Sequence, residues 1–223
     1  MKPNRIILIR HGESEGNVNK HKYETSPDYT LELTAAGIAQ AQNAGVQLQK
    51  IVGNESLFFY VSPMWRTRST FENVSKVFNK NNISYREDPR IREQEWGHLR
   101  NAEVNKDIRN ERDAYGTFYF RIPDGESAAD VYDRVSDFLG TLQRDFEKDD
   151  FPQNTVIVTH GMSIRLFLMR WFHWTVEEFE ALANPENCEI IVLEKTEEGK
   201  YKLASNITRY DTPWHEYQRP IQL

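Results

Sequence analysis

Two histidines in this chain of 223 residues end strand-like segments of the same kind, and each is followed by glycine. His11 stands in RIILIRHG, and His160 stands in TVIVTHG. In open α/β sheets, ligands bind at the carboxyl ends of the strands, so parallel neighbours would bring both imidazoles to one edge. A glycine after each histidine lets the backbone approach a ligand closely. One strand-end histidine is as readily structural as functional, but the repeated context favours a functional site.

Arginines are expected at the same edge of the sheet. Arg10 precedes the first histidine, and Arg66 and Arg68 follow another strand-like segment, residues 57–61. A guanidinium group matches a phosphate group with two hydrogen bonds and stays charged at every working pH. The helix expected to start near Gly161 would also direct free N–H groups into the cleft, which favours an anion. We therefore expect Arg10 and Arg66 to bind a phosphoryl group, and Arg68 to be an ordinary surface cation.

A carboxyl group would complete such a site. An alkoxide is a poor leaving group, so cleavage of a phosphate ester gains from an acid that protonates the departing oxygen. The segment DPRIREQEWG, residues 88–97, supplies Glu93 and Glu95 on an expected loop. The residue types alone do not choose between these two side chains.

Four motifs in a fixed order resemble those of a known family. They are RHGESEGN at residues 10–17, SPMWRTRST at 62–70, REQEWG at 92–97 and VTHG at 158–161. Together they resemble the histidine phosphatase superfamily, the phosphoglycerate-mutase-like group. The resemblance implies phosphoryl transfer through a phosphohistidine, with neither a metal ion nor a cofactor.

The resemblance also implies a role for each residue of the site. His11 would be the nucleophile. Arg10, Arg66 and a protonated His160 would form the phosphate pocket, with Asn17 as a further contact. The cations would stabilise the equatorial oxygens while the neutral nucleophile attacks phosphorus in line.

The acid is assigned by the same resemblance. Glu93 matches the acidic position of the family pattern L-x-E-x-x-x-G, so it would protonate the leaving oxygen and then, as a carboxylate, activate water. Ile91 stands where the leucine is usual, a departure that leaves the acid in place.

Several features favour hydrolysis over the alternatives. The Trp-Asn and Gly-Trp-x-Asp segments of cofactor-dependent mutases are replaced by other residues, and the E-R-H-Y-G insertion is missing after the acid. Residues 118–127 resemble a fungal and plant subgroup of broad-specificity acid phosphatases. A metal-independent phosphomonoesterase of small phosphorylated substrates is the leading hypothesis. A phosphoglycerate-type mutase and a weakly active, regulatory phosphate-binding protein are the alternatives.

The elements that must position these residues alternate between strand and helix. Strands are expected at residues 5–9, 57–61, 83–85 and 155–159, with closing strands at 189–193 and 200–204. Helices are expected at 34–51, capped by Thr34, at 66–78, at 127–147, with Ser127 a candidate cap, and at 163–172. This order predicts an α/β protein, a phosphoglycerate-mutase-like three-layer α/β/α sandwich with a mostly parallel central sheet. Residues 1–223 would form one domain, with an irregular excursion over the active site at about residues 88–123.

The composition of the chain limits which partners and which cellular compartment we expect for the protein. Asp and Glu total 34 against 28 Lys and Arg, a net charge of −6 that argues against a general nucleic-acid binder. No segment approaches the length of a membrane span, and the N-terminal apolar run is too short for a signal peptide. The single cysteine, Cys188, permits no disulfide within the chain. We expect a cytoplasmic protein that acts on a small phosphorylated substrate, and the resemblance allows a homodimer.

Overall fold

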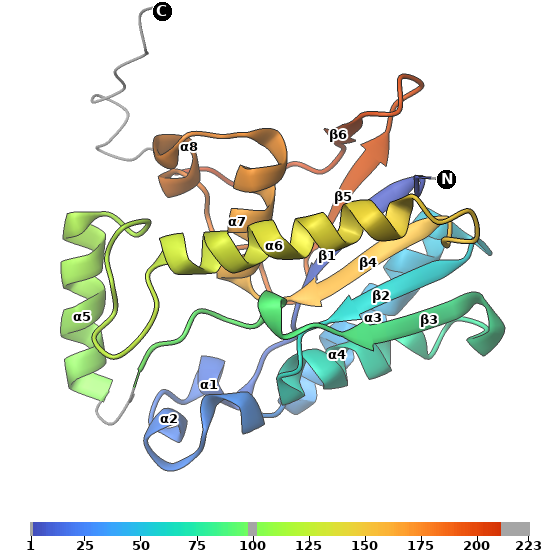
Figure 1. The fold of residues 1–223 in the computed structure, drawn as a ribbon. Helices are drawn as coiled ribbons and strands as arrows, with labels where there is room; N and C mark the ends of the chain where they lie inside the picture. The colour runs from blue at the N-terminus through green and yellow to red at the C-terminus, as the bar shows by residue number, and fades with distance from the viewer. Residues whose placement is uncertain (1, 98–101, 211–223) are drawn as a thin grey trace, which may run out of the picture.

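The central sheet has six strands in the order β3-β2-β4-β1-β5-β6 in the computed structural model, which describes residues 2–97 and 102–210 (Figure 1). Strands β3, β2, β4 and β1 are parallel, whereas β5 is antiparallel to β1 and forms a hairpin with β6. The prediction of a mostly parallel sheet is confirmed. The strands are β1 Arg5–Arg10, β2 Leu57–Val61, β3 Ile83–Glu87, β4 Asn154–Thr159, β5 Ile190–Lys195 and β6 Tyr201–Leu203.

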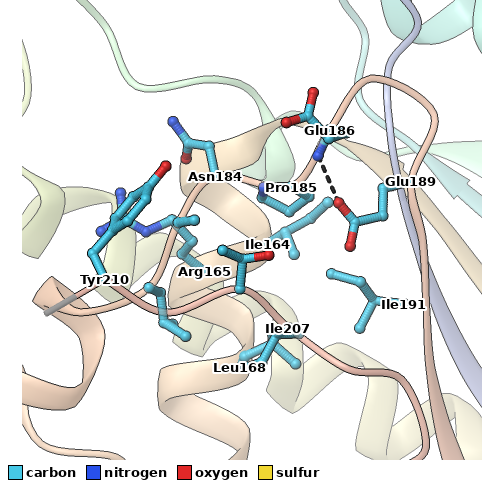
Figure 2. A pocket seen from close by; sticks show the side chains of 13 residues that line it. Ile164, Arg165, Leu168, Asn184, Pro185, Glu186, Glu189, Ile191, Ile207 and Tyr210 are labelled. Carbon is cyan, nitrogen blue, oxygen red and sulfur yellow. Dashed lines mark hydrogen bonds between the residues drawn. The ribbon is translucent and has the colours of Figure 1, made fainter.

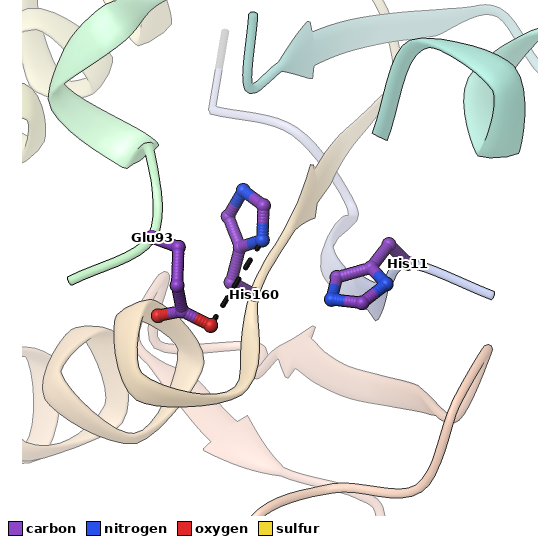
Figure 3. A group of neighbouring side chains, drawn as sticks. All are labelled: His11, Glu93 and His160. Atoms are coloured by element: carbon purple, nitrogen blue, oxygen red, sulfur yellow. Dashed lines mark ion pairs between the residues drawn. The ribbon is translucent and has the colours of Figure 1, made fainter. Parts of the chain in front are cut away.

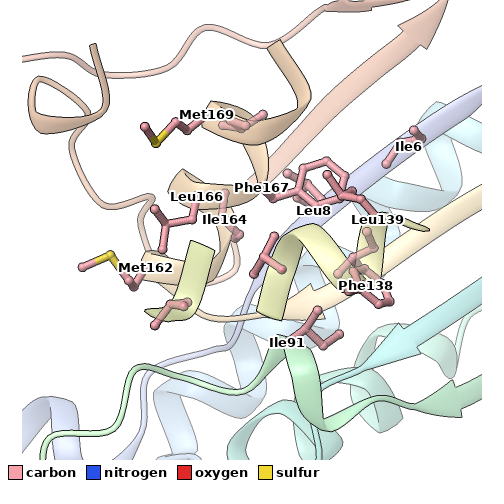
Figure 4. Close-up of a cluster of buried hydrophobic side chains, with 14 of the residues drawn as sticks. Ile6, Leu8, Ile91, Phe138, Leu139, Met162, Ile164, Leu166, Phe167 and Met169 are labelled. Carbon is pink, nitrogen blue, oxygen red and sulfur yellow. The ribbon is translucent and has the colours of Figure 1, made fainter. Parts of the chain in front are cut away.

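Helices cover both faces of this sheet, which confirms the three-layer sandwich (Figure 1). Ile7 and Ile9 of β1 belong to the core under α3 and α4, while Ile6 and Leu8 belong to the core under α6 and α7 (Figure 4). Burial on both faces is why β1 is continuously apolar rather than alternating. No helix of the described residues is both long enough and apolar enough to span a membrane. The helices are α1 Glu15–Val18, α2 Lys22–Thr25, α3 Ala35–Val52, α4 Trp65–Ser75, α5 Ala102–Tyr115, α6 Ala128–Phe146, α7 Gly161–Phe172 and α8 Val176–Glu180.

Two predicted helix starts are confirmed by their caps. The Thr34 hydroxyl accepts a hydrogen bond from the Gly37 N–H at 3.0 Å, and the Ser127 hydroxyl accepts one from the Asp130 N–H at 3.2 Å. Caps of this kind stabilise a helix by about 1 kcal/mol. Thr34 also donates a hydrogen bond to the Glu13 carboxylate at 2.6 Å, which joins the start of α3 to the loop after β1.

Residues 88–123 were predicted to be irregular, and this prediction is wrong for α5. The sequence of α5, AEVNKDIRNERDAY, holds few apolar residues, so no apolar periodicity marks it as a helix. Arg109 and Arg112 of α5 lie over the ring of Trp96, at 5.2 and 5.1 Å from its centroid. These cation–π contacts hold α5 against the segment that follows β3.

Candidate active site

His11 and His160 lie side by side where β1 and β4 end (Figure 3). The two strands are parallel neighbours with Arg10 opposite Thr159, so the next residue of each strand reaches the same edge. The ring centroids are 5.1 Å apart, and both side chains are buried. The sheet therefore brings the two imidazoles together as the sequence predicts.

The hydrogen bonding of His11 fixes its tautomer. Its Nδ1 lies 2.8 Å from the Gly12 carbonyl oxygen, which can only accept, so Nδ1 carries the proton. Burial, followed by the charges of Arg66 and Arg10, lowers the pKa of His11 well below its ordinary value. The imidazole is therefore neutral, and Nε2 keeps a free lone pair, as a nucleophile requires.

His160 lies deeper, with no exposed surface. Its Nε2 is 2.8 Å from the Ser62 hydroxyl, while its buried Nδ1 has no hydrogen-bond partner among the described residues and lies 3.9 Å from Glu93 Oε2. Burial, with Arg66 as the next cause, lowers the pKa of His160 well below its ordinary value. This direction favours the neutral imidazole, whereas the resemblance implies a protonated His160 when phosphate is bound. A bound phosphate dianion would favour its protonation.

The glycines that follow the two histidines, Gly12 and Gly161, allow other parts of the protein to pack closely against the backbone. A Cβ on Gly12 would lie 2.5 Å from the Gly37 carbonyl oxygen. A Cβ on Gly161 would lie 2.9 Å from the Asn184 side chain. The loop after β1 and the start of α7 are thereby packed against their neighbours, and Gly161 is the first residue of α7.

The two expected phosphate-binding arginines are already oriented by the protein. Arg66 is buried, and its Nη1 donates to both the carboxylate and the backbone carbonyl of Asp28 at 2.9 Å. Arg10 Nη1 donates to the Pro185 carbonyl at 2.6 Å, while its buried Nε has no partner among the described residues. Arg68 instead pairs with Glu87 at 2.6 Å, which confirms its role as a surface cation.

Asn17 holds the loop that follows His11. Its side-chain oxygen accepts a hydrogen bond from the Ser14 N–H at 2.9 Å, at the start of α1. Asn187 donates to the His11 carbonyl at 2.9 Å from the other side of the loop. Asn17 and Ser14 line the same pocket as His11.

The structure places Glu93, and not Glu95, in the pocket beside the histidines (Figure 3). Burial raises the pKa of Glu93 above its ordinary value, which favours the protonated form that a general acid needs. The backbone around it is fixed by the Arg134 guanidinium, whose Nη2 donates to the Glu93 carbonyl at 3.0 Å. Thr159 Oγ1 donates to the carbonyl of Ile91 at 2.6 Å, and Ile91 is buried in the core as the usual leucine would be.

The pocket contains residues that the sequence did not single out. Its volume is about 100 Å³, and Tyr23, Asp28, Trp96 and Arg109 complete the lining. Arg109 adds a third guanidinium group, and it comes from the helix α5 that apolar periodicity did not reveal. A cluster of aromatic and charged residues in segments 22–29 and 96–112 was the available signal, but no spacing rule connects them.

His11, Glu93 and His160 offer nitrogen and oxygen atoms within 4.8 Å of one another, a separation that could surround a metal ion. Arg10 and Arg66, however, impose a positive potential that lowers the pKa of His11. The same potential opposes a bound cation and favours an anion. The donor set therefore fits a phosphoryl group better than a metal ion.

A second cavity, of about 70 Å³, lies beside the segment that carries Pro185 (Figure 2). Arg165 lines it, buried against the ring of Phe179 at 4.4 Å from the centroid. Because Pro185 also accepts the hydrogen bond from Arg10, the segment around it forms a wall common to this cavity and the arginine of the candidate site.

Known proteins share both the sequence and the fold. A model of the histidine phosphatase superfamily (branch 1) matches residues 6–208. The phosphoglycerate mutase-like protein AT74 of Arabidopsis thaliana is 45% identical over 219 residues, covering 92% of this chain and 69% of that protein. The broad-range acid phosphatase DET1 of Saccharomyces cerevisiae is 30% identical over 303 residues, covering 94% and 91%. A solved mycobacterial glucosyl-3-phosphoglycerate phosphatase has the same fold, with a TM-score of 0.72 at 23% identity, covering 92% and 99%.

Proposed function

The chain belongs to the histidine phosphatase superfamily, and on this premise we propose that it hydrolyses small phosphate monoesters. The reaction needs no metal ion and passes through a phosphohistidine on His11. One observation carries the proposal: His11 is buried, neutral and protonated on Nδ1 in a pocket lined by three arginines. A lone pair on Nε2 beside converging positive charge suits attack on a phosphoryl group.

In the first step, His11 Nε2 attacks phosphorus and the bond to the ester oxygen breaks. Arg10 and Arg66 bind the equatorial oxygens, with Asn17 and the N-terminal N–H of α7 at Gly161 as further contacts. Protonated Glu93 gives its proton to the departing oxygen, so that the alcohol leaves uncharged.

In the second step, the phosphoryl group passes to water. Glu93, now a carboxylate, takes a proton from the water that attacks phosphorus, and the bond to His11 breaks. Inorganic phosphate leaves, and both side chains return to their starting protonation states. His160 donates from Nδ1 to the phosphoryl oxygens, a role for its otherwise unpartnered nitrogen.

The name of one relative supports hydrolysis. The yeast relative, at 30% identity over nearly its whole length, is named a broad-range acid phosphatase. The plant relative at 45% identity is named only mutase-like, a description that does not specify the acceptor of the phosphoryl group.

The test is release of inorganic phosphate from p-nitrophenyl phosphate and 3-phosphoglycerate, with EDTA present, by the wild type and by His11→Ala. We expect hydrolysis by the wild type, an acid-labile phosphoprotein in rapid quench, and loss of both in the variant. Substantial activity in His11→Ala would contradict the nucleophile. Interconversion of phosphoglycerates without phosphate release would instead identify a mutase.

A further inference from the structure

A larger groove adjoins the histidine pocket. Its volume is about 480 Å³, and it shares Tyr23, Asp28 and Trp96 with the smaller pocket of about 100 Å³. The smaller pocket has room for a phosphoryl group and little more. The groove is therefore the space in which the alcohol part of a phosphate monoester would lie.

Charge is divided sharply between these two spaces. The arginines Arg10, Arg66 and Arg109 line the small pocket. The described lining of the groove contains no lysine, arginine or histidine and instead presents three carboxylates, which belong to Glu24, Asp28 and Glu95. Arginines therefore line the phosphoryl end of the site, whereas the ionisable side chains that line the alcohol end are carboxylates and tyrosines.

The three carboxylates differ in the contacts they already make. Asp28 is held by Arg66, and Glu24 lies 3.1 Å from the ring nitrogen of His21. Glu95 is exposed and forms no ion pair within the described residues. Glu95 is accordingly the carboxylate with most charge to offer a ligand in the groove.

Aromatic rings stand beside these carboxylates. Tyr23, Tyr29 and Trp96 line the groove, and Tyr29 is held edge-on against Trp65 with ring centroids 6.5 Å apart. The Trp96 ring already carries the guanidinium groups of α5, at 5.1 and 5.2 Å from its centroid, so the two tyrosine rings are the ones left for a ligand. Aromatic faces attract ammonium groups, most strongly where a negative charge lies nearby. Rings and carboxylates together form a recognisable surface for an organic cation.

We propose that the groove selects phosphate monoesters of amino alcohols, with the ammonium group between Glu95 and Tyr29 while the phosphoryl group lies on His11. The inference rests on the proposed phosphatase function and specifies its substrate class. An alcohol that carries a carboxylate, such as glycerate, would place its negative charge against the acidic wall. Such esters are expected to be the poorest substrates.

Three two-carbon esters that differ only in their terminal group test this proposal. They are phosphoethanolamine, 2-hydroxyethyl phosphate and phosphoglycolate, which end in an ammonium, a hydroxyl and a carboxylate. We expect kcat/KM to fall in that order, by about three- to fivefold at each step, as for exposed cation–π contacts and ion pairs. Equal values or the reverse order, in an enzyme that hydrolyses p-nitrophenyl phosphate, would overturn the groove assignment and leave the phosphatase function intact. Absence of hydrolysis of every ester would instead contradict the proposed function itself.

The variants Glu95→Gln and Glu197→Gln locate the effect. Both remove one exposed negative charge, but Glu197 lies in the turn between β5 and β6, away from the groove. The ratio of kcat/KM for phosphoethanolamine to that for phosphoglycolate should fall about fivefold in Glu95→Gln and stay unchanged in Glu197→Gln. An unchanged ratio in Glu95→Gln, or an equal fall in both variants, would overturn the proposal.

Discussion

Replacement of Arg134 by alanine should damage stability and catalysis together. Arg134 is largely buried on α6, and its guanidinium donates to the Glu126 carboxylate at 2.9 and 3.0 Å and to three carbonyls, those of Arg90, Arg92 and Glu93. Its removal leaves the Glu126 carboxylate with the Arg92 side chain and the Glu95 N–H as its partners among the described residues. Breaking a buried pair typically costs 3–5 kcal/mol, and because those partners remain we expect a loss of about 3 kcal/mol.

The expected effect on catalysis follows from the loss of the hydrogen bonds that Arg134 donates to the backbone carbonyls. Without Arg134, the backbone that carries Glu93 loses its main restraint from α6. Small displacements of a catalytic group are costly, so kcat for an alkyl phosphate should fall about tenfold to hundredfold. Hydrolysis of p-nitrophenyl phosphate, whose leaving group scarcely needs a proton, should fall much less.

Urea denaturation and steady-state kinetics measure the two effects. Arg144→Ala is the matched control, because Arg144 lies on the same helix and is exposed, and its hydrogen bond within the described part of the chain goes to Thr141. That variant should change stability by less than about 0.5 kcal/mol and leave both substrates unaffected. If Arg134→Ala behaved like Arg144→Ala, the reasoning that α6 holds the proposed general acid, Glu93, would be refuted.

Three further predictions concern the pH profile of activity, stabilisation by inorganic phosphate and substitution of two glycines. Activity on alkyl phosphates should rise with pH as His11 loses its proton, because the pKa of His11 lies below its ordinary value. It should fall at higher pH as Glu93 loses its proton, because the pKa of Glu93 lies above its ordinary value. The falling limb should vanish from the pH profile of Glu93→Gln. Inorganic phosphate at roughly 100 times its Kd should stabilise the fold by about 2.7 kcal/mol in thermal unfolding, and an unchanged Tm would contradict the anion site. Gly12→Ala should lose about 2 kcal/mol by urea denaturation, because its Cβ would meet a backbone oxygen at 2.5 Å, whereas Gly140→Ala, with its nearest contact at 3.6 Å, should gain about 0.5–1 kcal/mol.

Patterns of neighbouring residues in the sequence predicted the strand and helix starts that short segments determine by themselves. The bounds of β2 and the caps at Thr34 and Ser127 follow from β-branched and aromatic runs and from side chains that bond the next turn. The meeting of His11 and His160 needed only the rule that parallel strands end at one edge.

The remainder depends on contacts between distant segments, which no local pattern encodes. Asp28 meets Arg66 across 38 positions, and Arg134 reaches the Glu93 carbonyl across 41. Glu93 and Glu95 are residues of the same type in the same segment, and only their positions relative to the pocket distinguish them. Arg109 was missed because α5 is a polar helix whose position depends on cation–π contacts with Trp96.

The strand order also determines when an active molecule can exist during synthesis. β4 lies between β1 and β2 in the sheet, although about 90 residues separate the end of β2 from the start of β4. A nascent chain shorter than about 160 residues has neither the strand that joins β1 to β2 nor the second histidine, so its two halves expose unpaired edges. Such long-range pairing is slow to form and leaves unfinished chains prone to association. Premature termination before β4 therefore yields an aggregation-prone fragment rather than a weakened enzyme.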